Sequence, residues 1–244
     1  MPPVIVEATA APAPDPGVSG SERARRLWTG SFRGVISTHS QAEPGYPFGS
    51  VVPFCLDAGG LPILLFSHLA QHSRNLGADA RCALTLYDTK AQDVHQSTRL
   101  TCLGDCSLLP AEDRAAATRY FRYFPRARGY FEELDFRLYR LVPLRFHFNG
   151  GFATARWLGT ERILAAATFD ETAESDLIEH VERRHPLVLQ THFRRARTDQ
   201  DPVRVAGIDP LGLDLRRGER LRRLHAPQPM ASPSDLDTFL RTLP

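Results

Sequence analysis

Residues 62–86, PILLFSHLAQHSRNLGADARCALTL, contain two apolar runs separated by a polar segment. The runs at 63–66 and 82–86 are short and bounded by polar residues, so each predicts a buried β-strand. The polar segment between them is typical of a turn or a helix start, whose free backbone N–H groups and dipole bind anions. An anion site and a polar connection with ordinary capping are both compatible with these residues. The side chains that such a site would use are Ser67, His72, Ser73, Arg74 and Asn75.

The composition is that of an ordinary globular protein. Of the 244 residues, 42% are hydrophobic and 24% are charged, which is enough apolar material for a packed core. A net charge of +2 argues against a nucleic-acid partner, which would require a strong basic excess. No apolar run approaches the length of a membrane-spanning helix, and the first residues lack the features of a signal peptide. We therefore expect a cytoplasmic protein without a membrane partner, with a Pro- and Ala-rich disordered tail at residues 1–20.

The strand pattern around the opening stretch predicts a small antiparallel barrel. Residues 21–150 contain about six strands joined by tight turns, with a few helices between them. A segregated α+β domain is the competing architecture. Pro53 predicts an edge position or a bulge within its strand, Pro110 is expected in the first turn of a helix, and Pro143 separates the last two strand-like segments. All the strand-like segments of residues 21–150, counting those on either side of Pro143 separately, lie at 34–39, 48–56, 63–66, 82–86, 99–108, 135–141 and 144–148.

Residues 173–244 predict a separate, small α+β domain that follows a linker at 165–173. The first helix of this domain has an apolar face that Pro186 interrupts, and short strands follow at 203–208 and 213–215. Ser232 is typical of a helix cap and predicts a closing helix at 232–243. Between residues 194 and 223 there are nine arginines against five acidic residues, and we interpret this face as a solvated surface.

Cysteines and histidines are the side chains that a metal would use. The four cysteines lie in or near apolar runs and form no zinc pattern, so we expect free buried thiols in a reducing compartment. His180 and His185 are five residues apart, which on one helix turns them about 140° from each other and argues against a zinc pair. A single imidazole is sufficient to ligate a haem iron, however. Asp135 either begins a strand or orients a histidine from elsewhere in the chain.

Five sequence blocks occur in the same order as in a known family. They are YPFGSVVPFCLD at 46–57, LLFSHLAQHSRNLGADARCAL at 64–84, RYFRYFP at 119–125, LDFRLYRL at 134–141 and GGFATARWL at 150–158. In this order they resemble the FMN-binding split-barrel proteins related to pyridoxamine 5'-phosphate oxidase, and more narrowly the HugZ-type haem-utilisation branch. The second part of the chain resembles the small C-terminal domain of that branch, whose two-histidine motif corresponds to His180 and His185 and whose G-I-D-x-x-G motif corresponds to residues 207–212.

The resemblance implies a mainly β fold with helices, in which residues 21–160 form a six-stranded antiparallel Greek-key split barrel. It also implies a homodimer with ligand sites at the subunit interface. The usual lysine of the flavin-phosphate pattern is replaced by Arg74, a side chain that pairs with phosphate bidentately. In haem-handling members a histidine ligates the iron, and here it would be His180 or His185. The cofactor-binding residues carried over from the family are Gly49, Ser50, Val51, Ser67, His72, Ser73, Arg74 and Asn75.

Three functions are compatible with this resemblance. The first is a haem-binding protein of iron utilisation, whose enzymatic form is a haem-degrading oxygenase. The second is an FMN-dependent oxidoreductase, and the third is a non-catalytic protein that binds or delivers haem or flavin. The sequence contains no G-x-S-x-G, P-loop or G-x-G-x-x-G motif, so catalytic residues are not assigned.

Overall fold

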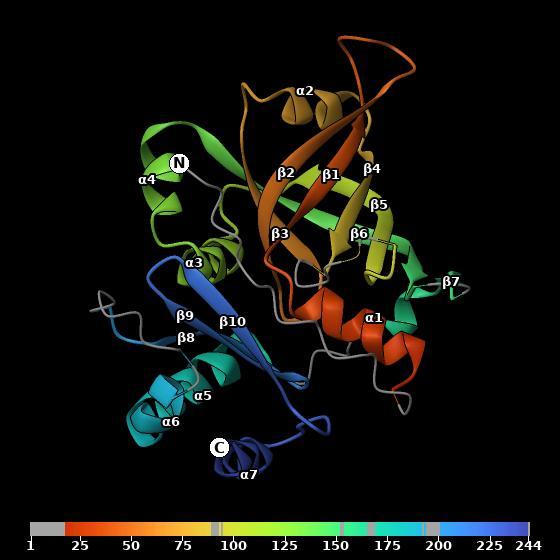
Figure 1. Cartoon of the computed structure of the whole chain (residues 1–244). Coiled ribbons are helices and arrows are strands. Elements are labelled where there is room, and N and C mark those ends of the chain that lie inside the picture. The colour runs from red at the N-terminus through yellow and green to blue at the C-terminus, as the bar shows by residue number, and fades with distance from the viewer. Residues whose placement is uncertain are drawn as a thin grey trace, which may run out of the picture.

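The computed structural model describes residues 18–88, 93, 95–151, 154–164, 169–191, 193 and 201–243. Figure 1 shows a strand barrel built from the first part of the chain and a smaller sheet with its own helices built from the last part. The predicted tail at 1–20 lies outside the described residues, except for its last three. The predicted linker at 165–173 is shorter than expected, because α5 (Glu171–Arg184) begins within it.

The first sheet closes into a six-stranded antiparallel barrel. Its hydrogen-bonded order is β3-β2-β1-β4-β5-β6, and β3 also pairs with β6, which joins the two ends of the sheet. A short strand, β7 (Arg156–Leu158), adds to β6 outside the closed ring. The split-barrel prediction is therefore confirmed. The barrel strands are β1 (Arg33–His39), β2 (Pro47–Leu56), β3 (Pro62–Ser67), β4 (Arg81–Tyr87), β5 (Arg99–Leu108) and β6 (Phe136–Asn149).

The last two predicted strands are one continuous strand, β6. Pro143 lies opposite Gly104 of β5, and the register then skips Leu144, so a bulge accommodates the proline without ending the strand. A side chain at Gly104 would collide with the backbone carbonyl of Val142, so this crossing requires glycine. Pro53 lies where β2 pairs with β1 but not with β3, as its edge prediction requires.

Four helices pack around the barrel: α1 (Gly20–Thr29), α2 (Gln71–Ala78), α3 (Arg114–Tyr123) and α4 (Ala127–Glu133). Ser19 caps α1 as predicted, and Trp28 of this helix is buried in the barrel core. The prediction for Pro110 was wrong. The side chain of Asp113 accepts a hydrogen bond from the backbone N–H of Ala116, so α3 starts at Arg114, four residues after Pro110. Among the described residues, every helix is too short or too polar to cross a bilayer.

The second sheet has the order β10-β9-β8 and packs against the later helices. Its third strand, β10, was not predicted, because its arginine-rich sequence was interpreted as a solvated surface. The side chain of Arg223 is instead only 2% exposed and pairs with Asp209 and Asp214. The elements of this part are α5, α6 (Pro186–Thr191), β8 (Arg204–Asp209), β9 (Gly212–Arg217), β10 (Arg220–His225) and α7 (Pro233–Thr242), after a short 3-10 helix at Thr160–Arg162.

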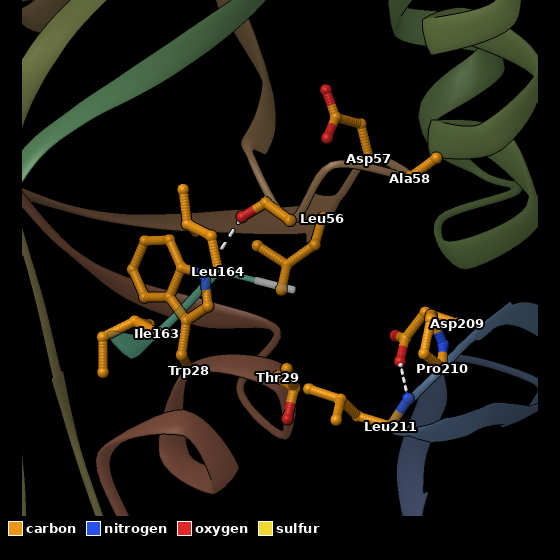
Figure 2. Close-up of a pocket in the computed structure, with 11 residues that line it drawn as sticks. Trp28, Thr29, Leu56, Asp57, Ala58, Ile163, Leu164, Asp209, Pro210 and Leu211 are labelled. Atoms are coloured by element: carbon orange, nitrogen blue, oxygen red, sulfur yellow. Dashed lines mark hydrogen bonds between the residues drawn. The ribbon is translucent and has the colours of Figure 1, made fainter. Parts of the chain in front are cut away.

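A buried ion network joins the barrel to the second sheet. Glu174 of α5 accepts hydrogen bonds from Arg119 and Arg122 of α3, and its other oxygen accepts one from the backbone N–H of Ile208. Figure 2 shows the neighbouring seam, where Thr29 and Leu56 on the barrel side lie across from the turn at 209–211, around a cavity of about 20 Å³. The two parts are therefore closely packed at this seam.

Candidate functional site

The barrel is split between β2 and β3. β3 pairs with β2 only at residues 54–56, so among the described strands residues 47–53 of β2 have β1 as their single neighbour. Unpaired backbone N–H and C=O groups at such a free edge are available to a ligand. The start of α2 lies beside this edge (Figure 1). We call the free edge at 49–51, the end of β3 at Ser67 and the α2 residues 72–75 the split site.

His72 is the side chain that links α2 to the free edge. Its Nδ1 atom lies 3.2 Å from Oγ of Ser50 on β2, and its ring packs on Phe66 with 4.4 Å between the ring centroids. Burial lowers the pKa of His72, so the imidazole is neutral at pH 7. When Nδ1–H donates to Ser50, Nε2 carries the free lone pair. Among the described residues, no protein group bonds to this Nε2.

Two of the predicted ligands hold the segment together instead. Ser73 is buried, and its hydroxyl donates to the carbonyl oxygen of Ser67 at 2.7 Å, which fixes the turn before α2. Asn75 is fully buried, donates to Thr38 on β1 and accepts from the backbone N–H of Gln41. These hydrogen bonds position α2, and the role of Ser73 and Asn75 as cofactor ligands stays a prediction.

The remaining predicted residues lie on accessible surface. Gly49 and Val51 face outward from β2, on the opposite side of the strand from Ser50, and Val51 is 76% exposed. Arg74 is exposed on α2, and its guanidinium donates to the carbonyl of Leu69 at 2.6 Å. The predicted set therefore divides into three groups. His72 is oriented by Ser50, Ser73 and Asn75 hold α2 in place, and Gly49, Val51 and Arg74 are exposed.

A cluster on the outer face of the barrel was not included in the predicted site, although the sequence places Arg145 and His147 opposite the apolar residues of their strand. On β6, the guanidinium of Arg145 lies 5.0 Å from the ring centroid of Trp157, and the ring of His147 meets the same indole edge-on at 4.9 Å. The pairing of Thr101 with His147 and of Thr85 with Thr101 continues this face onto β5 and β4. The alternation at 144–148 was the available signal, because it places Arg145 and His147 away from the core.

The two candidate iron ligands of the second part converge on one carboxylate. Nε2 of His180 and Nε2 of His185 lie 3.0 and 3.1 Å from the same Oδ1 atom of Asp237 on α7. The expectation that they point apart was wrong, because α5 ends at Arg184 and His185 adopts a non-helical conformation. We call His180, His185 and Asp237 the His–Asp cluster.

Two smaller sequence expectations are also settled. Asp135 orients a histidine, since its carboxylate lies 3.1 Å from Nδ1 of His68, although both side chains are about half exposed. All four cysteines are free and buried, as predicted, and burial raises the pKa of the Cys55 thiol to about 12. A protonated, inaccessible thiol of this kind is a poor nucleophile and a poor metal ligand.

The family model described as CREG, beta-barrel matches residues 17–163, which is more than half of the 244 residues. The chain belongs to the CREG β-barrel family. The match contains all six barrel strands and the whole split site of this family member, and it ends before α5. The His–Asp cluster therefore lies outside the part that defines the family.

Relatives of this CREG β-barrel protein have been described in several organisms. Over 141 residues it is 38% identical to the chloroplastic non-canonical haem oxygenase HOZ of Arabidopsis thaliana, and this alignment covers 57% of the chain and 42% of the plant protein. A protein of unknown function from Agrobacterium tumefaciens has the same fold over the full length of both chains, with a TM-score of 0.76 and 22% identity. A haem-binding protein from Mycobacterium smegmatis gives a TM-score of 0.55 at 24% identity, covering 93% of this chain and 96% of that one.

Proposed function

We propose that this protein binds haem at the split site in haem and iron utilisation, and that its enzymatic form is a haem-degrading oxygenase. The observation that carries the proposal is the neutral imidazole of His72, held at Nδ1 by Ser50 with Nε2 unengaged by the described protein groups. The relation to a plant haem oxygenase supports it. Because the alignment covers less than half of that plant protein, its activity is part of this proposal.

The split site fits haem by the chemistry of its side chains. A neutral imidazole ligates haem iron, and a hydrogen bond at the other ring nitrogen orients it and selects the tautomer. Arg74 is exposed and can exchange the carbonyl of Leu69 for a propionate, because guanidinium–carboxylate hydrogen bonds are stronger than those to a neutral carbonyl. Bound haem would supply the iron and its oxygen chemistry, and the protein would hold and orient it.

The proposal includes a homodimer formed through the outer face of the barrel. Val51 is 76% exposed beside the unpaired edge of β2, and a second copy seated there would cover both this apolar side chain and the free backbone groups. A second copy over β2 and β1 would also cover the split site and exclude water from it. The four free thiols fit a reducing compartment such as the cytoplasm, which is part of the same proposal.

Titration of the untagged full-length chain with haemin tests the proposal. We expect a Soret band for the wild type, its loss or a clear shift in His72→Gln, and no change in His95→Ala, an exposed histidine in the loop before β5. Glutamine keeps the size of the side chain and a hydrogen bond to Ser50 but does not ligate iron. If His72→Gln keeps the wild-type band, the split-site assignment is wrong.

His180 and His185 remain the second candidates for the iron ligand. Both Nε2 atoms are directed at Asp237, so iron could bind there only after that contact breaks. Loss of the Soret band in His180→Ala or His185→Ala, with His72→Gln unaffected, would move the haem to this part of the chain.

A flavin-dependent oxidoreductase is the alternative that the same site supports. Arg74 directly follows Ser73 at the start of α2, where a flavin phosphate would bind in the related flavoproteins. Yellow flavin that copurifies with the wild type and is absent from Arg74→Ala would favour it. Haem that binds but persists under ascorbate and oxygen would leave the delivery role without turnover.

A further inference from the structure

We propose that the His–Asp cluster binds one divalent first-row transition metal ion, with Zn²⁺ as the probe. His180, His185 and Asp237 each offer one ligand atom, and these atoms all lie within 4.8 Å of one another. This site is separate from the haem site proposed above, and neither inference depends on the other.

Two of the three separations in the cluster match those of a coordination site, and the two Nε2 atoms lie within 4.8 Å of each other. With metal–ligand bonds of 2.0–2.1 Å, neighbouring ligand atoms lie about 3.0 to 3.4 Å apart in octahedral or tetrahedral geometry. Nε2 of His180 and Nε2 of His185 lie 3.0 and 3.1 Å from Oδ1 of Asp237. A metal ion therefore needs only small side-chain movements to enter, whereas a porphyrin would need the whole contact to open.

The local sequence explains why the two histidines converge. On a continuous helix they would point about 140° apart. Pro186 prevents α5 from continuing, and the backbone N–H of His185 closes the helix on the carbonyl of Val181 at 2.8 Å. His185 then has φ −124° and ψ 37°, which turns its ring toward the same carboxylate that His180 contacts.

The donor set selects the class of ion. Two imidazoles and one carboxylate suit zinc, iron, cobalt or nickel, and they are poor ligands for calcium or magnesium, which prefer oxygen only. The three side chains are between 16% and 27% exposed, so water can fill the remaining positions. Three protein ligands with an open position is the pattern of reactive, exchangeable sites, whereas purely structural zinc sites have four protein ligands.

The same three side chains could serve only as a hydrogen-bonded latch between α5 and α7. In that case both Nε2 atoms carry a proton and donate to Asp237, and metal binding would have to displace these protons. The two interpretations differ in one measurable property, because a latch gains nothing from added Zn²⁺. An ion that binds only the folded state raises its stability.

Isothermal titration of the untagged, chelator-treated full-length chain with Zn²⁺ tests the proposal. We expect one ion per chain and a higher melting temperature in Zn²⁺. Affinity should fall by at least about a hundredfold in His180→Ala and in Asp237→Asn, because each change removes a ligand and not only an outer-shell partner. His68→Ala is the matched control, because His68 also pairs with an aspartate but has no third ligand within reach among the described residues, so it should bind like the wild type.

Co²⁺ provides a readout that needs no variant. In the wild type we expect a visible d–d absorption spectrum that differs from that of aqueous Co²⁺, because imidazole and carboxylate ligands replace water. The proposal is overturned if the wild type takes up no Zn²⁺ at millimolar concentration, or if Co²⁺ keeps its aqueous spectrum. It is also overturned if the cluster variants bind as tightly as His68→Ala.

Discussion

The split site and the His–Asp cluster both present imidazole nitrogens, but the partners of these nitrogens differ. At the split site, Nδ1 of His72 is hydrogen-bonded to Ser50, and no described protein group bonds to its Nε2. The ring lies beside the unpaired edge of β2. In the His–Asp cluster, the Nε2 atoms of His180 and His185 are both directed at Asp237. The first arrangement suits one large planar ligand, and the second suits one small cation.

In both proposals the second partner of the histidine, a hydroxyl or a carboxylate, determines which ligand the site suits. A hydroxyl at Nδ1 orients one ring and leaves its other nitrogen accessible. A carboxylate between two rings creates a compact set of three ligand atoms. The family resemblance made His180 and His185 the candidates for a haem iron, and their contacts favour a small ion.

The largest expected effect concerns the buried ion network between the part with the split site and the part with the His–Asp cluster. Glu174 is buried and joins α3 to α5, so Glu174→Ala leaves Arg119 buried without its ion pair. We expect a loss of about 3–5 kcal/mol in the free energy of unfolding, measured by urea denaturation. Glu179→Ala removes the exposed pair with Arg183 and should cost less than about 1 kcal/mol. Equal effects of the two variants would show that the buried network stabilises the protein no more than an exposed pair does.

The second prediction concerns a third kind of histidine, whose imidazole is buried beside positive charge. Burial, with Arg223 and Arg26 nearby, lowers the pKa of His225 to about 4 from 6.5. Between pH 6.5 and pH 4 the unfolded chain therefore binds a proton at His225 that the folded protein does not bind. The free energy of unfolding falls as the pH falls through this range. The contribution of this group is at most about 3 kcal/mol.

Urea denaturation of the wild type and His225→Gln at pH 7 and pH 4 measures this contribution. The wild type should lose more stability than the variant over this range. Asp214 acts in the opposite direction, because its burial raises its pKa to about 6 and its protonation favours the folded state. Since Asp214 is present in both proteins, its effect cancels in the difference. A variant with the same pH dependence as the wild type would contradict the assignment.

The smallest effect concerns the support of His72. Ser50→Ala removes the hydroxyl at Nδ1 but leaves the imidazole in place. We expect the affinity for haemin to fall about tenfold, as for other groups that orient a ligating histidine. Ser107→Ala, an exposed serine on β5, should bind haemin like the wild type. An unchanged affinity in Ser50→Ala would mean that this hydrogen bond does not prepare the ligand.

The barrel could largely be predicted from sequence, because its strands carry apolar residues in short runs or alternation between strong turns. The prolines were harder to interpret. Pro143 was expected to end a strand, but glycine at 104 on the neighbouring strand gives room for a bulge. At Pro186 the interruption of the helix was predicted, yet its consequence for His185 depends on a backbone conformation that helical spacing does not contain.

The second sheet was harder to predict because charges form part of its interior. Arg223 is buried between Asp209 and Asp214, three residues that lie on three different strands. A sequence shows an arginine-rich segment there but not which carboxylates neutralise it. Asp237 was missed as a ligand for the same reason, since it lies 52 residues from His185 along the chain.

The most direct test of two separate histidine sites is to titrate the same three proteins with haemin and with Zn²⁺. His72→Gln should lose the Soret band and keep its Zn²⁺ site. Asp237→Asn should lose Zn²⁺ and keep the Soret band, and the wild type should bind both. If one substitution abolishes both ligands in a folded protein, or if Asp237→Asn loses the Soret band while His72→Gln keeps it, the assignment of haem to the barrel and metal to the second part is contradicted.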